Sequence, residues 1–189
     1  MEDLQNEELE APKTPLQHAV KFGLILGMVS AIVTLLLYVI DPTLMVNVWM
    51  LLLLLVFIGL VIYGGISYRN EIGGYIDFGP AYIHGFTVLV VMGVIGLLMN
   101  LLMYNVVDTS LADTLTEASI EQTRGMMENF GAPEDAIDEA LEKAEADAAA
   151  SFTNFGLIKS FFISLIVYAV IALITALIVR RREKVSDVY

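Results

Sequence analysis

The first long apolar stretch of the chain, residues 22–40, reads FGLILGMVSAIVTLLLYVI and carries no formal charge. At about 1.5 Å per residue, an α-helix of this length crosses a hydrocarbon core of about 30 Å. Three more stretches without Asp, Glu, Lys or Arg follow, at residues 43–68, 78–107 and 160–179. A buried helix of a soluble protein could explain one of them, but a chain of 189 residues has too little polar sequence to cover four. The sequence therefore predicts an all-α integral membrane protein with four transmembrane helices.

Composition and the absence of known motifs argue against several classes of function. Hydrophobic residues make up 57% of the chain and charged residues 17%, and a net charge of -12 argues against nucleic acid as a partner. Cysteine is absent, and the two histidines, His18 and His84, lack the close spacing of a zinc site. The sequence also has no GxSxG nucleophile motif and no GxxxxGK[ST] phosphate-binding loop. We therefore expect a non-enzymatic protein without a metal or a cofactor.

The basic residues predict the orientation of the chain in the membrane. Both termini and the loop after the second span hold seven of them, namely Lys13, Lys21, Arg69, Arg180, Arg181, Arg182 and Lys184. The opposite side holds three, namely Arg124, Lys143 and Lys159. By the positive-inside rule, the N- and C-termini are cytoplasmic. The predicted plan is an acidic cytoplasmic tail at 1–18, three transmembrane helices within 19–107, an acidic extracytoplasmic loop at 108–159, a fourth helix at 160–179 and a basic cytoplasmic tail at 180–189.

The loop at 108–159 holds twelve acidic and three basic residues. Helical spacing nevertheless recurs in it. Leu111, Leu115, Ala118 and Gln122 trace a weaker stripe, and the apolar residues Ile137, Leu141, Ala144, Ala148 and Phe152 trace one face of a second helix. Gly131 is placed to end the first helix and Pro133 to start the second. We expect a helical hairpin that covers the outer end of the bundle. Its acidic face is either merely solvated or a surface for a basic partner or weakly held divalent cations.

Small and polar residues recur along the spans at helical spacing. The first span has Gly23 and Gly27, and the third has Gly93, Gly96 and Asn100. Such stripes let helix backbones approach closely where hydrophobic burial supplies no force between helices. We expect them to pack the bundle within one chain, with self-association of two chains as the alternative. Leu26, next to Gly27, is expected to face lipid.

Two polar side chains on the third span are candidates for more than packing. Asn100 lies deep in the span, where an amide usually bonds across to a neighbouring helix and less often contacts a substrate. His84 lies near the inner end, where we expect water or lipid headgroups to satisfy it, with proton sensing as the alternative. No Asp, Glu, Lys or Arg lies within a span, which argues against ion-coupled transport.

The loop between the second and third spans, together with the start of the third span, reads RNEIGGYIDFGPAYIHGF, residues 69–86. Before the last span the chain reads MENFGAPEDAIDEALEKAEA, residues 127–146. Both stretches resemble the uncharacterised Bacteroidota membrane family known as domain of unknown function 4199. The positions that carry the resemblance in the first motif are Arg69, Asn70, Gly73, Gly74, Phe78 and Gly79. The resemblance implies a bacterial inner-membrane protein without an assigned activity. In physical terms, the double glycine predicts a turn with positive φ, which serves either as a structural turn or as part of a cytoplasmic binding site.

These observations favour an accessory or scaffold protein that acts in the inner membrane through helix packing and its acidic loop. Its expected partners are the lipid bilayer and another membrane protein or a second copy. The alternative is a small transporter or channel whose pathway runs between the glycine-lined helices and past Asn100. A membrane enzyme ranks third, because His84, Asp77 and Glu71 form no recognisable catalytic set.

The predicted orientation can be tested with single cysteines, because the chain has none of its own. We expect a membrane-impermeant thiol reagent to label Ser119→Cys but not Ser186→Cys in intact cells. Labelling of Ser186→Cys alone would show that the orientation is the inverse.

Overall fold

The computed structural model describes residues 14–182; most of the predicted N-terminal tail and the labelling position Ser186 lie outside the described residues. Eight helical elements follow one another: α1 Pro15–Ile40, the 3-10 turn η1 Pro42–Val46, α2 Met50–Glu71, α3 Phe78–Leu102, the π-helical turn η2 Met103–Val107, α4 Leu111–Asn129, α5 Glu134–Ser151 and α6 Asn154–Val179. Within 14–182 there is no strand, only an isolated bridge between Ile76 and Arg181. Helices α1, α2, α3 with η2, and α6 are long and apolar enough to cross a bilayer, so the chain is a multi-pass membrane protein.

Capping side chains place the helix starts outside the uncharged stretches. The Thr14 hydroxyl accepts the Gln17 backbone N–H at 3.2 Å, and the Gln17 side chain accepts the Thr14 N–H at 3.1 Å. This capping box starts α1 at Pro15. Helix α6 starts at Asn154, earlier than the expected 160, because the Thr153 hydroxyl accepts the Gly156 N–H at 2.9 Å.

The expected start of the second span at residue 43 is wrong, since α2 begins at Met50. The Asp41 carboxylate accepts hydrogen bonds from the backbone N–H and the hydroxyl of Thr43, at 2.9 and 2.8 Å. These bonds hold the chain in the 3-10 turn η1 instead of a continuing α-helix. The apolar side chains of Met45 and Val46 pack instead against the start of α4.

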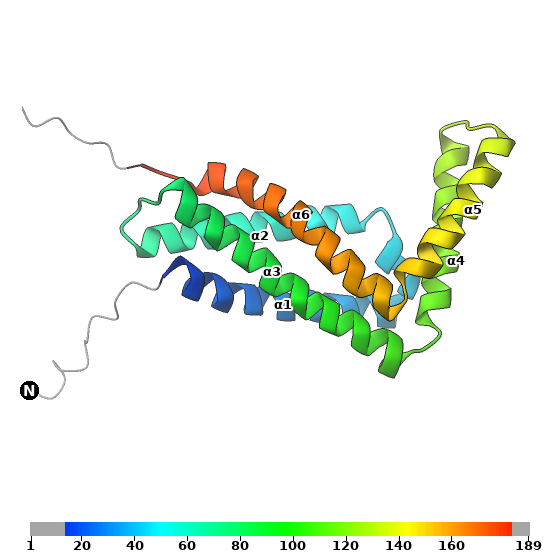
Figure 1. Cartoon of the computed structure of the whole chain (residues 1–189), viewed down its shortest axis with the longest axis horizontal. Coiled ribbons are helices and arrows are strands. Elements are labelled where there is room, and N and C mark those ends of the chain that lie inside the picture. The colour runs from blue at the N-terminus through cyan, green and yellow to red at the C-terminus, as the bar shows by residue number, and fades with distance from the viewer. Residues whose placement is uncertain (1–13, 183–189) are drawn as a thin grey trace, which may run out of the picture.

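Helix α3 lies between α1 and α6, and α2 lies behind it (Figure 1). The buried core between these helices consists of Ala19, Leu26, Val61, Val88, Leu89 and Ala172. The expectation that Leu26 faces lipid is wrong, because only 4% of it is exposed. The core cluster that contains Leu26 also contains Val61 of α2 and Val88 of α3, so neighbouring helices cover α1 over a wider face than the glycine stripe.

The glycine pair of α1 packs within the chain. A Cβ atom on Gly23 would lie 2.9 Å from Cβ of Val91 and 3.0 Å from the carbonyl oxygen of Val88. A Cβ atom on Gly27 would overlap the side chain of Ile95. Both contacts are with α3, so these glycines allow the two backbones to approach closely.

Helices α4 and α5 pack against each other and cross one end of the bundle, called here the α4–α5 end (Figure 1). Their buried residues include Leu111 and Leu115 on α4 and Ile137 and Leu141 on α5. Gly131, with φ of +70°, lies in the turn that joins them. The opposite end of the bundle carries the loop between α2 and α3 and is called the loop end.

Asp108 fixes the junction between α3 and α4. Its carboxylate accepts the Ser110 hydroxyl at 2.6 Å, the Ser110 backbone N–H at 2.9 Å and the Tyr38 hydroxyl at 3.2 Å. The bonds from Ser110 are the main reason that the pKa of the Asp108 carboxyl is lowered. The Tyr38 bond ties this junction to α1.

The contact between α1 and α3 can be tested with a matched pair of substitutions. Gly27→Ile forces a branched side chain into Ile95 and should destabilise the protein by about 1–3 kcal/mol. Met28→Ile is the control, since Met28 is 59% exposed on the same helix. Thermal unfolding in detergent measures both, and equal midpoints for the two variants and the wild type would contradict the packing.

Candidate functional site

A cavity lined by apolar residues and a few uncharged polar ones lies in the half of the bundle nearest the α4–α5 end, and we call it the polar cavity. It consists of two adjoining pockets of about 300 and about 430 Å³. Both pockets are lined by Ser30, Gly96, Asn100, Leu157 and Ser160. The first pocket extends towards Tyr168 on α6, and the second extends under η1, Leu115 and Phe152. A space of this size accommodates a small molecule or part of a larger one.

The packing of the helices explains why this space is empty of side chains. Within residues 14–182, α1 and α6 each pack on α3 but not on each other. Small residues face the gap, and a Cβ atom on Gly96 would have no heavy atom within 4 Å. Gly93, by contrast, is filled by Tyr168, whose hydroxyl would lie 2.7 Å from a Cβ atom there. The two glycines of the predicted α3 stripe thus differ: Gly93 packs against Tyr168, whereas Gly96 leaves space for the cavity.

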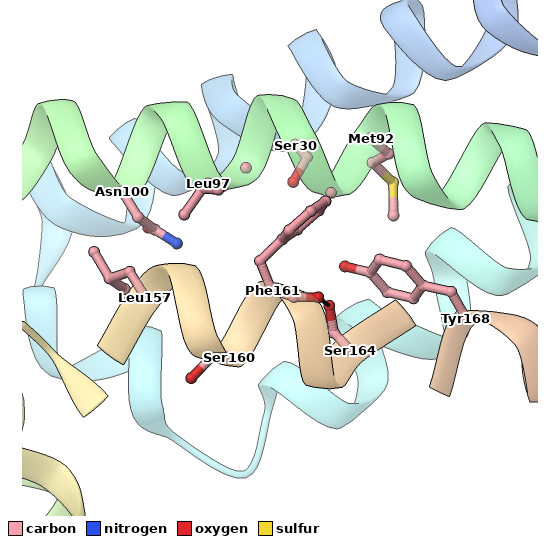
Figure 2. A pocket seen from close by; sticks show the side chains of 11 residues that line it. Ser30, Met92, Leu97, Asn100, Leu157, Ser160, Phe161, Ser164 and Tyr168 are labelled. Carbon is pink, nitrogen blue, oxygen red and sulfur yellow. Dashed lines mark hydrogen bonds between the residues drawn. The ribbon is translucent and has the colours of Figure 1, made fainter. Parts of the chain in front are cut away.

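Several polar groups of the cavity have no protein partner. Thr34 and Ser164 donate their hydroxyls to carbonyls of their own helices, at 3.0 and 2.7 Å. The side chains of Ser30, Asn100 and Ser160 make no hydrogen bond to any part of the chain between residues 14 and 182. Figure 2 shows Asn100 of α3 directed towards α6, beside Leu157.

The expectation that Asn100 bonds across to a neighbouring helix is therefore not met. The bond exists one turn further on, where sequence reasoning missed it. Asn105 donates its amide to Asn154 at 2.8 Å and accepts the Asn154 amide at 3.0 Å, which joins η2 to the start of α6. Two asparagines near the boundaries of adjacent spans are the available signal, but their spacing along the chain does not reveal the pairing.

A second polar cluster lies at the loop end. Nδ1 of His18 lies 2.9 Å from Nε2 of His84, which joins α1 to α3. Nε2 of His18 lies 3.5 Å from a carboxylate oxygen of Glu71 on α2. His84 is 1% exposed, so the expectation that water or headgroups satisfy it is wrong. It faces the interior because α3 turns this side towards α1 and α2.

Aromatic rings enclose the histidine pair. Tyr68 of α2 stacks on His84 with ring centroids 5.3 Å apart, and Phe22 stacks on His18 at 6.1 Å. A hydrogen bond between two imidazoles requires one nitrogen to donate and the other to accept, so at least one ring is neutral. Among the described residues, no group of three His, Cys, Asp or Glu side chains is placed to hold a metal ion. The partly buried hydrogen bond joins α1 to α3, and the contacts of Tyr68 and Glu71 add α2 to the cluster.

The predicted loop motif joins α2 to the end of α6. Arg69 donates from Nη1 to the carbonyl of Val179 at 2.9 Å. Gly73 and Gly74 have φ of +101° and +86°, as the double glycine predicts. Ile76 and Arg181 exchange two backbone hydrogen bonds of 3.0 Å. These contacts support the structural interpretation of the loop. Of the other motif residues, Phe78 packs beside Ile76, Asn70 is exposed, and Gly79 has open space where a Cβ would lie.

The two asparagines predict opposite responses to substitution. Asn100→Leu removes an amide without a protein partner, so the unfolding midpoint in detergent should stay unchanged or rise. Asn105→Leu breaks the reciprocal pair and should cost about 1 kcal/mol. Thermal unfolding of both variants decides this, and an equal loss for Asn100→Leu would show that Asn100 holds the bundle together.

Comparison with models of known protein families places the chain in a family. The model of the family described as "Protein of unknown function (DUF4199)" matches residues 21–181. No curated protein and no solved structure matches the chain. The matched range contains all four apolar helices almost completely, the loop motif and the α4–α5 pair. This chain therefore belongs to the DUF4199 family of proteins of unknown function.

Proposed function

We propose that this chain is a non-enzymatic accessory protein of the bacterial inner membrane that binds an uncharged, hydrogen-bonding molecule in the polar cavity. In this proposal both termini are cytoplasmic, and the α4–α5 end faces outward. The basic residues Lys21, Arg69 and Arg180–Arg182 support this orientation, since they gather at the loop end.

The observation that carries the proposal is the set of polar groups without partners. An amide or hydroxyl that is kept from water without a hydrogen-bond partner costs about 1–3 kcal/mol, and at membrane depth this applies to the half-buried Asn100 and Ser30 and to the exposed Ser160. Asn100, Ser30 and Ser160 face one space instead of one another. A bound molecule with donors and acceptors would satisfy them and recover that cost.

Charge defines the kind of molecule. No Asp, Glu, Lys, Arg or His of the described residues lines either pocket. A phosphate or ammonium group inside the bundle would have no counter-charge, which is unfavourable at membrane depth. The polar cavity therefore suits an uncharged ligand.

Transport of the same molecule is the second candidate, because the residues predicted to line a pathway, Gly96 and Asn100, do line the cavity. The loop-end half of the bundle argues against an open pore. There α1 and α3 are in close contact at Gly23 and Gly27, and Leu26 and Val88 are buried. Transport would require this contact to open.

Filling the cavity tests the proposal. Gly96→Leu places a side chain in open space, so it should remove the ligand without disturbing the helices. Gly59→Leu is the matched control, since a Cβ on Gly59 also meets no atom within 4 Å but lies on the exposed side of α2. The measurement is mass spectrometry of small molecules that copurify with tagged protein from native membranes.

We expect a molecule that copurifies with the wild type and with Gly59→Leu but is lost from Gly96→Leu. The same set of copurifying molecules in all three proteins would contradict ligand binding in the polar cavity. For the wild type and Gly59→Leu, an additional stoichiometric protein partner would strengthen the accessory role.

A further inference from the structure

The routes by which a molecule can reach the polar cavity are unequal. At the α4–α5 end, Met103, Leu111 and Leu115 are almost completely buried and pack with Tyr104 and Phe152. This apolar cluster separates the cavity from the water beyond α4. At the loop end, the glycine contacts between α1 and α3 close the bundle. Entry through the loop end is therefore blocked, whereas the second pocket reaches η1 and the exposed Ser151 at the end of α5.

The side of the bundle next to α2 is open. Three lining residues of the second pocket are exposed, namely Met50 at the start of α2, Ser151 at the end of α5 and Ser160 on α6. They mark an opening where the starts of α2 and α6 meet the end of α5, at the boundary of the candidate membrane spans. In a bilayer, the flank of a transmembrane bundle faces lipid.

The part of α2 beside this opening does not pack on the bundle. A transmembrane helix normally keeps one face covered by its neighbours. On the first turns of α2, exposed side chains point in nearly every direction, namely Leu51 59%, Leu52 52%, Leu54 45%, Leu55 62% and Val56 59%. The packed part begins at Phe57, which is 8% exposed, and continues to Tyr68. This leucine-rich segment, residues 51–56, directly follows Met50, which lines the second pocket.

The approach and the cavity therefore differ in chemistry along one route. The approach is apolar, and the interior offers an amide and hydroxyls without partners and no charge. An apolar approach that leads to uncharged polar groups suits a molecule with a hydrocarbon chain and an uncharged polar head. A lipid with a phosphate head does not fit, because the interior holds no cation to pair with it.

We propose that the ligand is a neutral amphipathic lipid that enters sideways from the bilayer past residues 51–56 and bonds through a hydroxyl, ester or amide head to Asn100 and Ser160. This inference rests on the proposed binding function and adds the class of ligand. The lipid chain covers the exposed segment of α2, and the head replaces the missing hydrogen-bond partners.

The test uses full-length protein in phosphatidylglycerol vesicles doped with a photoactivatable diacylglycerol that carries its label near the head. A photoactivatable phosphatidylglycerol with the label at the same position is the comparison. After irradiation, peptide mass spectrometry locates the crosslinks. We expect the neutral probe to mark the cavity residues around Asn100 and Ser160, and the charged probe to mark only lipid-facing positions.

Gly96→Leu should reduce the cavity crosslinks of the neutral probe about tenfold, whereas Gly59→Leu should leave them unchanged. Equal cavity labelling by both probes, or cavity labelling that Gly96→Leu leaves intact, would overturn the neutral-lipid proposal. So would absence of cavity labelling when a water-soluble molecule still copurifies with the wild type and is lost from Gly96→Leu. That last result would still support the binding function. If the wild type showed neither cavity crosslinks nor a copurifying molecule, both proposals would be overturned.

Discussion

The close contact between α1 and α3 sets the geometry of the bundle. In a bilayer, apolar helices gain little by hiding from lipid, so their association depends on tight packing and on hydrogen bonds between them. Gly23 and Gly27 supply the tight packing, because they let the α1 backbone rest on Val88, Val91 and Ile95. At the loop end of the same interface, His18 and His84 supply a partly buried hydrogen bond of 2.9 Å. The remaining helices are arranged around this pair.

The two halves of the bundle differ because most of the hydrogen bonds and ring contacts between the spans lie at the loop end. At the loop end, Glu71 and Tyr68 bring α2 to the histidine pair, and Arg69 reaches the carbonyl of Val179. Bridging bonds between Ile76 and Arg181 close the same end. Towards the α4–α5 end, Gly96 and Ser160 both line the polar cavity, and no large side chain fills it. A rigid end and an open end follow from where the small and polar residues lie.

The polar groups of the open end explain why we assign it a binding role. Asn105 and Asn154, which are both exposed, pair their amides reciprocally. Asn100, one turn earlier, is left without a partner beside a cavity. A polar side chain left unpaired beside a cavity, while a neighbouring one is paired, is typical of a functional site. The uncharged lining and the bare segment of α2 point in turn to a neutral molecule from the membrane.

The sequence by itself determined the four spans, the helices of the acidic segment and the turn at Gly73 and Gly74. These features depend on local properties: the length of uncharged stretches, helical spacing and backbone conformation. The helix starts at Pro15 and Met50 were not predicted, because pairs of hydrogen bonds made by Thr14 and by Asp41 decide them.

Only the tertiary structure decided which face of each span looks inward. Both the lipid side and the core side of these helices are apolar, so the sequence has no strong contrast to mark the buried face. For that reason Leu26 and His84 were placed wrongly, and the pairing of His18 with His84 across 66 positions was invisible. The polar cavity has the same origin, because it exists only where α1, α3 and α6 fail to fill the space between them.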